Sequence, residues 1–259
     1  MLNSVKGKVC VVTGAARSIG LGIAEKYCKD GAKVAMIDIN PEVMKQAERL
    51  TAEGGTAKGY ILDITDRDAV LACFEQIVKE MGPVFALVNN AGIVDQRPFE
   101  EITADQINKQ MAVNVNGTLF CSQGAVKSMK PGKEGRIINF SSKSGKTGSA
   151  LMAHYSAAKG AIIALTHALA FELAGSNIQV NCICPGITDA TGVWSEVSAG
   201  YTTNMNMSRE DVIKTFTAKI PLKRLTNIED VVEMVYFLTL KGDYMTGQAY
   251  NITGGREMH

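Results

Sequence analysis

Short apolar runs alternate along the whole chain with longer stretches whose apolar residues recur at helical spacing. The short runs predict strands at Lys8–Val12, Lys33–Ile37, Ala57–Leu62, Val84–Val88, Arg136–Phe140, Gln179–Cys184 and Ala249–Ile252. The longer stretches predict helices over Ile19–Lys29, Pro41–Ala52, Arg67–Met81, Ala104–Met129, Tyr155–Leu173 and Ile228–Leu240. Strands that alternate with helices form parallel sheets covered on both faces. The pattern therefore predicts a single α/β domain over residues 1–259, with a doubly wound, seven-stranded parallel sheet.

One segment, at about 187–220, departs from this rhythm. It has no clear strand and contains Trp194, Tyr201, Met205 and Met207. Long loops inside compact domains are usually lids or binding segments. We therefore expect a substrate lid here, with Trp194 facing the substrate. The alternative is a surface insertion with a short helix of its own over Arg209–Lys219.

Composition narrows the class of protein. Apolar residues make up 46% of the 259 residues, which suits a globular protein with a sizeable core. The net charge of +1 comes from 27 basic and 26 acidic residues, so we expect neither a nucleic-acid partner nor a membrane-binding basic patch. No apolar run approaches the ~20 residues of a membrane span, and Met1–Lys8 lacks the apolar core of a signal peptide. We expect a cytoplasmic protein.

The cysteines and histidines indicate neither disulfides nor a metal site. The six cysteines are scattered, and only Cys182 and Cys184 lie close together, within one predicted strand. That spacing alone does not produce disulfide geometry. The three histidines have no recognisable ligand spacing. We expect buried structural thiols in a reducing compartment and no bound metal.

The first strand leads directly into a turn rich in small residues, Thr13–Gly20, which precedes the first helix. Small residues at this place let backbone N–H groups and the helix N-terminus approach a pyrophosphate. Because the turn follows the first strand of an alternating chain, it predicts a Rossmann-type dinucleotide site. Its glycines do not follow the order G-x-G-x-x-G, so a different glycine register is needed.

Asp38 ends the second predicted strand. An acidic residue about twenty positions beyond the turn is placed to accept hydrogen bonds from the adenosine ribose. The same carboxylate repels a 2′-phosphate, which favours NAD over NADP as the cofactor. Arg17, in the turn, is a signal in the opposite direction.

Tyr155 and Lys159 are four residues apart, so on a helix their side chains share one face. A tyrosine hydroxyl normally loses its proton near pH ~10, and a cation held close lowers that pKa. The pair is then suited to general acid–base work on an alcohol or a carbonyl. The alternative for this spacing alone is an ordinary exposed helix pair.

These motifs together resemble the short-chain dehydrogenase/reductase family, from about Lys6 to Gly255. Thr13–Gly20 resembles the family's turn T-G-x-x-x-G-x-G, with Ser18 in place of the middle glycine. Asn89–Gly92 matches N-N-A-G, and Pro185-Gly186 matches the motif that closes over the nicotinamide. The resemblance implies a catalytic tetrad of Asn114, Ser142, Tyr155 and Lys159, with Ser141 as the competing register for the serine. It implies cofactor contacts from Gly14, Arg17, Ser18, Ile19, Gly20, Asp38, Asp63, Ile64, Asn90, Ala91, Gly92, Tyr155, Lys159, Pro185, Gly186, Ile187 and Thr188.

The resemblance also implies a reaction, in which Tyr155 exchanges a proton with the substrate oxygen while hydride moves to or from the nicotinamide. In this scheme Lys159 lowers the tyrosine pKa and holds the ribose, Ser142 polarises the substrate oxygen, and Asn114 positions a water molecule. Family members commonly form tetramers, so we expect a homotetramer. The remote alternative is a catalytically silent, dinucleotide-sensing protein.

The run Ser142–Ser149 contains two lysines, Lys143 and Lys146, just after the implied catalytic serine. An ammonium group is a usable point charge for an anionic substrate, with Lys223, Arg224 and Arg256 as further candidates if the tail folds over the site. The run resembles the corresponding segment of bacterial sorbitol-6-phosphate 2-dehydrogenases, a group within the family. We therefore expect a polyol or phosphorylated polyol and its ketose as substrates. The alternatives are a 3-oxoacyl thioester or another small carbonyl compound, and lysines that simply face solvent.

Overall fold

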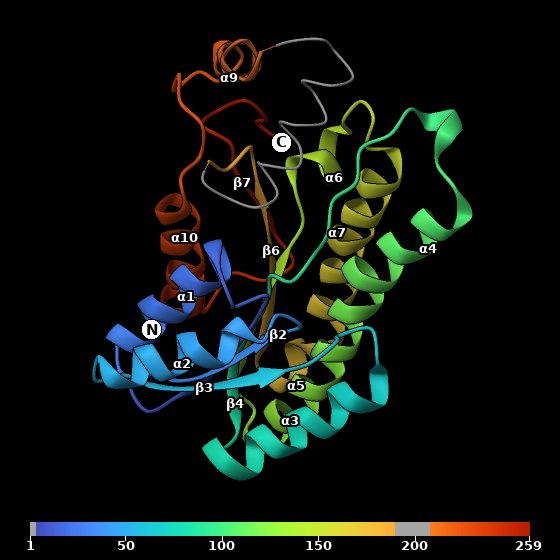
Figure 1. Ribbon diagram of the computed structural model, residues 1–259. Coiled ribbons are helices and arrows are strands. Elements are labelled where there is room, and N and C mark those ends of the chain that lie inside the picture. Colours follow the sequence, from blue (N-terminus) through green and yellow to red (C-terminus); the bar gives the residue numbers. More distant parts are fainter. Residues whose placement is uncertain (1–3, 190–207) are drawn as a thin grey trace.

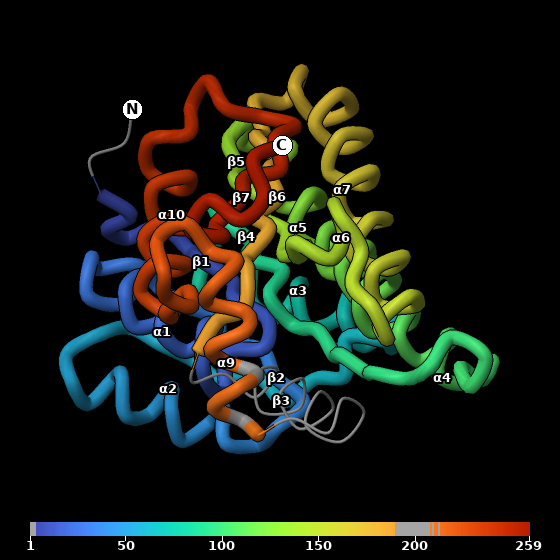
Figure 2. Tube along the Cα trace, turned by 90° about the horizontal axis from the view of Figure 1, so that it is seen from above, coloured from blue at the N-terminus to red at the C-terminus, as the bar shows by residue number. Residues whose placement is uncertain are grey.

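A computed structural model describes residues 4–189 and 208–259 of the chain (Figures 1 and 2). Its centre is a seven-stranded parallel sheet with strand order β3-β2-β1-β4-β5-β6-β7. The strands are β1 Val9–Thr13, β2 Lys33–Asp38, β3 Thr56–Ile61, β4 Val84–Asn89, β5 Gly135–Phe140, β6 Ile178–Pro185 and β7 Ala249–Ile252. The predicted doubly wound Rossmann architecture is confirmed.

Helices cover both faces of this sheet, as its apolar strands require. They are α1 Ser18–Lys29, α2 Glu42–Ala52, α3 Arg67–Met81, α4 Ala104–Met111, α5 Thr118–Gly132, α6 Lys143–Thr147, α7 Ala153–Leu173, α9 Arg209–Ala218 and α10 Ile228–Lys241. Three short turns, η1 Phe99–Glu101, η2 Ala112–Gly117 and η3 Ala174–Ser176, complete the described elements. α1 and α10 pack on one face, and α3, α5 and α7 pack on the other (Figure 1).

The central strands are apolar throughout because both of their faces are buried. Every residue of β1, β4 and β5 is buried. Residues that alternate along one strand enter different cores: Cys10 and Val12 pack with α1 and α10, whereas Val9 and Val11 pack with α3 and α5. This two-sided burial explains why the strands could be located from their sequences.

Two parts of the helical prediction are corrected. The single helix predicted over Ala104–Met129 is interrupted by η2, a six-residue π-helical turn, so that α4 and α5 are separate. α6, directly after β5, was not predicted, and its side chains turn out to matter for the site. The predicted helix Arg209–Lys219 is present as α9, one residue shorter.

α7 is long and apolar enough, together with η3, to pass a length-and-hydropathy test for a membrane span. This differs from the expectation that no such segment exists. The helix packs against β5, β6 and α6 as part of the folded domain. It carries Tyr155 and Lys159 on its sheet side, and both residues are buried.

Sheet topology fixes where a ligand can bind. The strand order reverses between β1 and β4, whose next neighbours along the chain lie on opposite sides. In open α/β sheets, ligands bind outside the carboxyl ends of the strands at such a point. The turn after β1 and the segment after β4 therefore meet at the expected cofactor position.

Candidate active site

The turn between β1 and α1 is packed so tightly that glycine is required at two positions. Gly14 has a φ of 67°, in the left-handed region that glycine tolerates. A Cβ atom added at Gly20 would lie 2.0 Å from the carbonyl oxygen of Gly14. Without side chains at these two positions, the backbone N–H groups at the N-terminus of α1 are not covered, and a pyrophosphate can approach them.

Ser18 replaces the middle glycine of this turn and adopts the backbone that a glycine would have. Its φ is 54°, a left-handed value that is costly for a residue with a Cβ atom. The serine thus leaves the course of the turn intact and carries strain. The side chain of Ser18 lines the adjoining cleft together with Arg17 and Ile19.

Asn90, just after β4, holds this turn in place. Its side-chain amide donates to the carbonyl oxygens of Thr13 (3.0 Å) and Gly14 (3.1 Å). In return, the hydroxyl oxygen of Thr13 accepts the backbone N–H groups of Asn90 and Ala91, both at 3.1 Å. Thr13 was not among the expected cofactor contacts; its place as the first residue of the turn motif Thr13–Gly20 was the available signal.

Asp38 lies at the rim of the same cleft, at the end of β2. One of its oxygens accepts the backbone N–H of Ala16 and the other accepts that of Asn40, both at 2.9 Å. Arg17 is exposed and forms no ion pair with any described residue. The carboxylate is therefore a fixed charge at this rim of the cleft, whereas Arg17 has no charged partner among the described residues.

The cleft runs along the carboxyl ends of β1, β2 and β4. Its lining contains most of the expected cofactor residues, namely Gly14, Arg17, Ser18, Ile19, Gly20, Asp38, Asp63, Ile64, Asn90, Ala91 and Gly92. The carboxylate of Asp63 accepts the backbone N–H and the hydroxyl of Thr65, at 2.9 and 2.8 Å. An adjoining cavity shares Ile19, Asn90, Gly92 and Ile93 with the cleft, so that the two are continuous.

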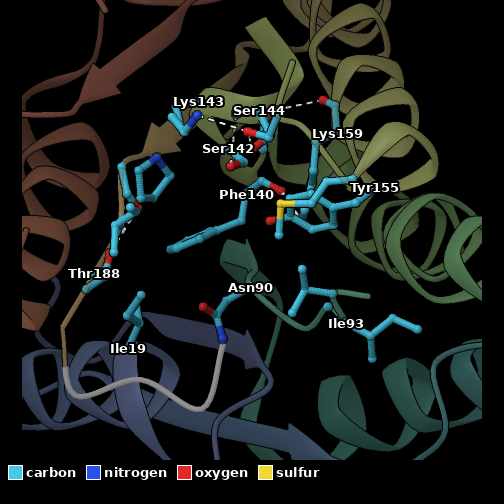
Figure 3. Close-up of a pocket in the computed structure, with 18 of the residues that line it drawn as sticks. Ile19, Asn90, Ile93, Phe140, Ser142, Lys143, Ser144, Tyr155, Lys159 and Thr188 are labelled. Atoms are coloured by element: carbon cyan, nitrogen blue, oxygen red, sulfur yellow. Dashed lines mark hydrogen bonds between the residues drawn. The ribbon is translucent and has the colours of Figure 1, made fainter. Parts of the chain in front are cut away.

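Tyr155 and Lys159 both line this second cavity, which encloses about 920 Å³ including its open mouth (Figure 3). The Nζ atom of Lys159 lies 5.8 Å from the ring centroid of Tyr155 and donates to the carbonyl oxygen of Phe140 at 2.9 Å. The alternative of an exposed helix pair is wrong, since both residues are at least nine-tenths buried.

Burial dominates the electrostatics of this pair. It raises the pKa of Tyr155, although the neighbouring Ser142 hydroxyl acts in the opposite direction. It lowers the pKa of Lys159 from 10.5 to about 8. The expected lowering of the tyrosine pKa is therefore not seen in this structure, because the ammonium is directed at Phe140 and desolvation is the larger effect.

The two candidate serines have different partners. The hydroxyl of Ser141 is buried and donates to the carbonyl oxygen of Lys159 at 2.7 Å. Ser142 begins α6, and its hydroxyl accepts the backbone N–H of Ser144 at 3.1 Å while facing Tyr155 (Figure 3). Ser142 is thus the serine whose hydroxyl is available beside the tyrosine.

Asn114 lies inside the π turn η2 and is buried. Its side chain bonds both polar groups of Ile93: the oxygen accepts the Ile93 N–H (3.1 Å), and the amide donates to the Ile93 carbonyl (2.9 Å). A Cβ atom added at Gly92 would lie 2.6 Å from the Asn114 side-chain oxygen and 3.4 Å from Lys159 Nζ. π turns inserted into α-helices are frequent at functional sites. Here the turn presents Asn114 to the floor of the cavity.

The second cavity has one hydroxyl-rich wall. Lys143 donates from Nζ to the hydroxyl oxygen of Ser149 at 2.9 Å, and the hydroxyls of Ser149 and Ser144 lie 2.8 Å apart. The facing wall is apolar and contains Ile93, Val94, Met152, Ile187 and Phe216. Ser144 and Ser149 were not expected from the sequence, because α6 and the turn after it were not foreseen; of the apolar wall, only Ile187 was expected.

The structure separates the two candidate lysines. Lys143 lines the cavity, whereas Lys146 is outside its lining and donates to the carbonyl oxygen of Ala249 at 2.6 Å. Pro185, Gly186, Ile187 and Thr188 line the cavity as expected. Trp194 lies outside the described residues.

Of the other three cations expected near the site, two bind elsewhere and one approaches the cavity. Lys223 donates to the carbonyl oxygen of Ala218, and Arg224 forms a two-pronged pair with Asp230 on the surface. Only Arg256 approaches the cavity, through the ring of Phe216. All six cysteines are buried and unpaired, in agreement with structural thiols.

Comparison with known proteins places this site in a family. The profile of the family described as short chain dehydrogenase matches residues 8–202. Sorbitol dehydrogenase of Cereibacter sphaeroides is 38% identical over 256 residues, which cover 97% of this chain and 98% of that protein.

Two solved structures are similar over nearly the full length. NAD⁺-bound xylitol dehydrogenase superposes with a TM-score of 0.92 at 31% identity, covering 97% of this chain and 99% of the other. A structure from Beutenbergia cavernae with NADP bound at low occupancy superposes with a TM-score of 0.88 at 31% identity, covering 98% of each chain.

Proposed function

This chain belongs to the short-chain dehydrogenase family and is an oxidoreductase acting on CH–OH groups, and we propose that its substrates are a polyol or phosphorylated polyol and the corresponding ketose, with NAD as cofactor. The observation that carries the proposal is the convergence of Ser142, Tyr155 and Lys159 with Lys143 around one cavity, continuous with the dinucleotide cleft.

The geometry supports the following roles, which are part of the proposal. In the oxidation, the substrate hydroxyl gives its proton to the deprotonated Tyr155 oxygen, and the carbinol C–H bond is broken to leave a ketone and release a hydride. The bound nicotinamide supplies the redox chemistry by accepting that hydride or, in reverse, donating it. Ser142 hydrogen-bonds the reacting oxygen, and Lys159 holds the ribose and supplies positive charge beside the phenolate. Asn114 fixes the segment after β4 and offers a place for a relaying water.

Substitution of the tyrosine tests the role of the site. Tyr155→Phe removes only the hydroxyl, so we expect turnover to fall by about 10²–10⁴-fold, as for the loss of a general acid–base group, while cofactor binding is retained. Turnover is measured by NADH absorbance and cofactor affinity by fluorescence titration. Near-normal turnover in the variant would refute the assignment.

The choice of NAD rests on Asp38. Its carboxylate is held at the ribose end of the cleft by two backbone N–H groups, where it would repel a 2′-phosphate. Steady-state kinetics with both cofactors provide the test. A lower KM for NADP(H) than for NAD(H) would assign the decisive charge to Arg17 instead.

The substrate proposal draws support from Lys143 and the hydroxyls beside it. Burial lowers the pKa of Lys143, and nearby Arg256 acts in the same direction. An anionic group bound beside the ammonium would offset that burial. The experiment compares sorbitol 6-phosphate with sorbitol in the wild type, in Lys143→Ala and in Lys146→Ala. We expect Lys143→Ala to lose about tenfold in kcat/KM for the phosphate, as for one charge-assisted contact, and Lys146→Ala to lose little. Equal rates for both compounds would exclude the phosphorylated class.

A second candidate activity, reduction of a 3-oxoacyl thioester, is favoured by the apolar wall around Met152 and Phe216. An acetoacetyl thioester belongs in the same assay. If it is reduced faster than any ketose, the apolar wall rather than Lys143 sets the specificity.

We also propose a cover over the cavity, formed by α9 and by residues 187–189. Ile187, Ile213 and Phe216 pack around Met152 and Tyr155 in one small apolar cluster. The rest of the expected lid, residues 190–207, lies outside the described part of the chain. The buried free thiols support a reducing, cytoplasmic location.

A further inference from the structure

The C-terminal tail brings a second cation to the substrate cavity. The guanidinium carbon of Arg256 lies 5.4 Å from the ring centroid of Phe216, and Phe216 lines the cavity together with Lys143. Arginine commonly stacks on aromatic rings in this way while its edge nitrogens remain available. Arg256 thus packs against a residue of the cavity wall.

Most of the hydrogen-bonding capacity of Arg256 is unused. Its Nε atom lies 3.3 Å from Oε1 of Glu257, and the side chain is only 19% exposed. Neither terminal nitrogen has a hydrogen bond or ion pair to any residue in the described ranges. The free edge of a guanidinium matches the oxygens of a phosphate or carboxylate in a two-pronged contact.

Glu257 is built into the fold next to it. Its carbonyl oxygen accepts Asn251 Nδ2 (3.0 Å) and Thr253 Oγ1 (3.3 Å), and its N–H donates to the same hydroxyl. The side chain is 6% exposed, and Oε2 has no hydrogen-bond partner. A carboxylate held in this way fixes the position of the arginine through Nε.

The charges of this region act on one another. After burial, Arg256 and Lys219 lower the pKa of Lys143, whereas Glu257 raises it. Two further cations and one carboxylate are therefore close enough to Lys143 to act on its charge. A neutral polyol leaves the repulsion among the cations uncompensated, whereas an oxyanion relieves it.

We propose that Arg256 is a specificity-determining residue, which binds the oxyanion of a phosphorylated substrate together with Lys143, and that Glu257 positions its guanidinium. This inference rests on the proposed polyol activity of the same site. On this proposal, the C-terminal tail distinguishes phosphorylated from neutral polyols.

The first experiment compares kcat/KM for sorbitol 6-phosphate and sorbitol. Arg256→Gln should lower the ratio of the two values by about tenfold or more, because one charge-assisted two-pronged contact is lost. Arg256→Lys keeps the positive charge but not the two-pronged contact, so it should keep part of the ratio that Arg256→Gln loses. Glu257→Gln should lower the ratio by a smaller factor, mainly through KM. Arg224→Gln is the matched control, since that guanidinium already pairs with Asp230. An unchanged ratio in Arg256→Gln would overturn the inference.

The second experiment does not depend on turnover and uses inorganic phosphate as the probe. Phosphate should raise the melting temperature of the wild type and of Arg224→Gln, but not that of Arg256→Gln or Lys143→Ala. If no polyol is oxidised and this pattern still appears, the proposed function fails while the anion site stands. If phosphate stabilises all variants equally, or stabilises none, the anion site is refuted.

Discussion

At the scale of a single residue, burial of the charged Lys159 side chain in the site lowers the free energy of unfolding. Its ammonium is buried under the cavity, and burial lowers its pKa from 10.5 to about 8. Between these pH values the unfolded chain binds the proton and the folded chain does not, so stability rises with pH. Below pH 8 the full cost of burying the charge is present, and the shift corresponds to about 3 kcal/mol.

The prediction is a change in pH dependence on substituting this lysine. Lys159→Met removes the titrating group. The variant should therefore be more stable than the wild type at pH 7.5, and this difference in unfolding free energy should shrink by up to about 3 kcal/mol by pH 10.5. Urea unfolding at several pH values measures it. Lys127→Met, at an exposed position of α5, controls for general alkaline effects. A pH-independent difference would mean that the buried amine keeps an ordinary pKa.

Ser18 offers a second prediction at this scale. Its φ of 54° is strained for any residue with a Cβ atom. Ser18→Gly should therefore raise the unfolding free energy by up to about 1 kcal/mol, or ~2–4 °C in melting temperature for a chain of this size. Ser18→Ala keeps the strain and should show no such gain, so an equal rise in both variants would point to the hydroxyl instead of the backbone.

At the scale of elements, the sequence predicts those helices, strands and turns that leave a recognisable apolar pattern or turn motif. The central strands β1, β4 and β5 were found because burial on both faces leaves a largely apolar run, whereas β3, of which only Gly59 and Tyr60 are buried, gave a weaker signal. The glycines and Asp38 were found because the turn after β1 has a fixed chemistry. The division of Ala104–Met129 was missed because a π turn changes the backbone bonding partner without changing the apolar pattern. α6 was missed for a related reason: its five residues are too few to show the helical repeat of apolar positions.

The π turn predicts a specific clash. A Cβ atom added at Gly117, its last residue, would lie 2.5 Å from Cδ1 of Ile64. Gly117→Ala should therefore cost about 1–3 kcal/mol of stability, as overpacking usually does, and weaken dinucleotide binding, since Ile64 lines the cleft after β1. Gly132→Ala, where no atom lies within 4 Å, is the control. Ile64→Val in the double variant should restore part of both losses; no rescue would place the cause in the helix itself.

At the scale of the whole molecule, α7 has a face that one subunit leaves uncovered. In the stretch formed by α7 and η3, an 18-residue window of mean hydropathy 1.3 is only 33% buried. The seam Ala157, Ala161, Ala164, Ala168 and Phe171 is spaced alternately by four and three residues, and four of its members are exposed, with Phe171 at 87%. Small residues along such a seam let helices pack closely, so we propose that α7 meets its counterpart in a second subunit of a homotetramer.

The seam predicts how assembly would fail. Ala164→Arg places a long charged side chain at its centre, where a partner helix would have to bury the charge at a cost of several kcal/mol. Sedimentation velocity should therefore show dimers or monomers for this variant and tetramers for the wild type. Glu172→Arg adds the same side chain at an exposed position outside the seam and should remain tetrameric. Because Tyr155 and Lys159 lie on the opposite side of the same helix, we expect dissociation to lower turnover as well as the melting temperature. A tetramer that survives Ala164→Arg would assign the subunit contact to another surface.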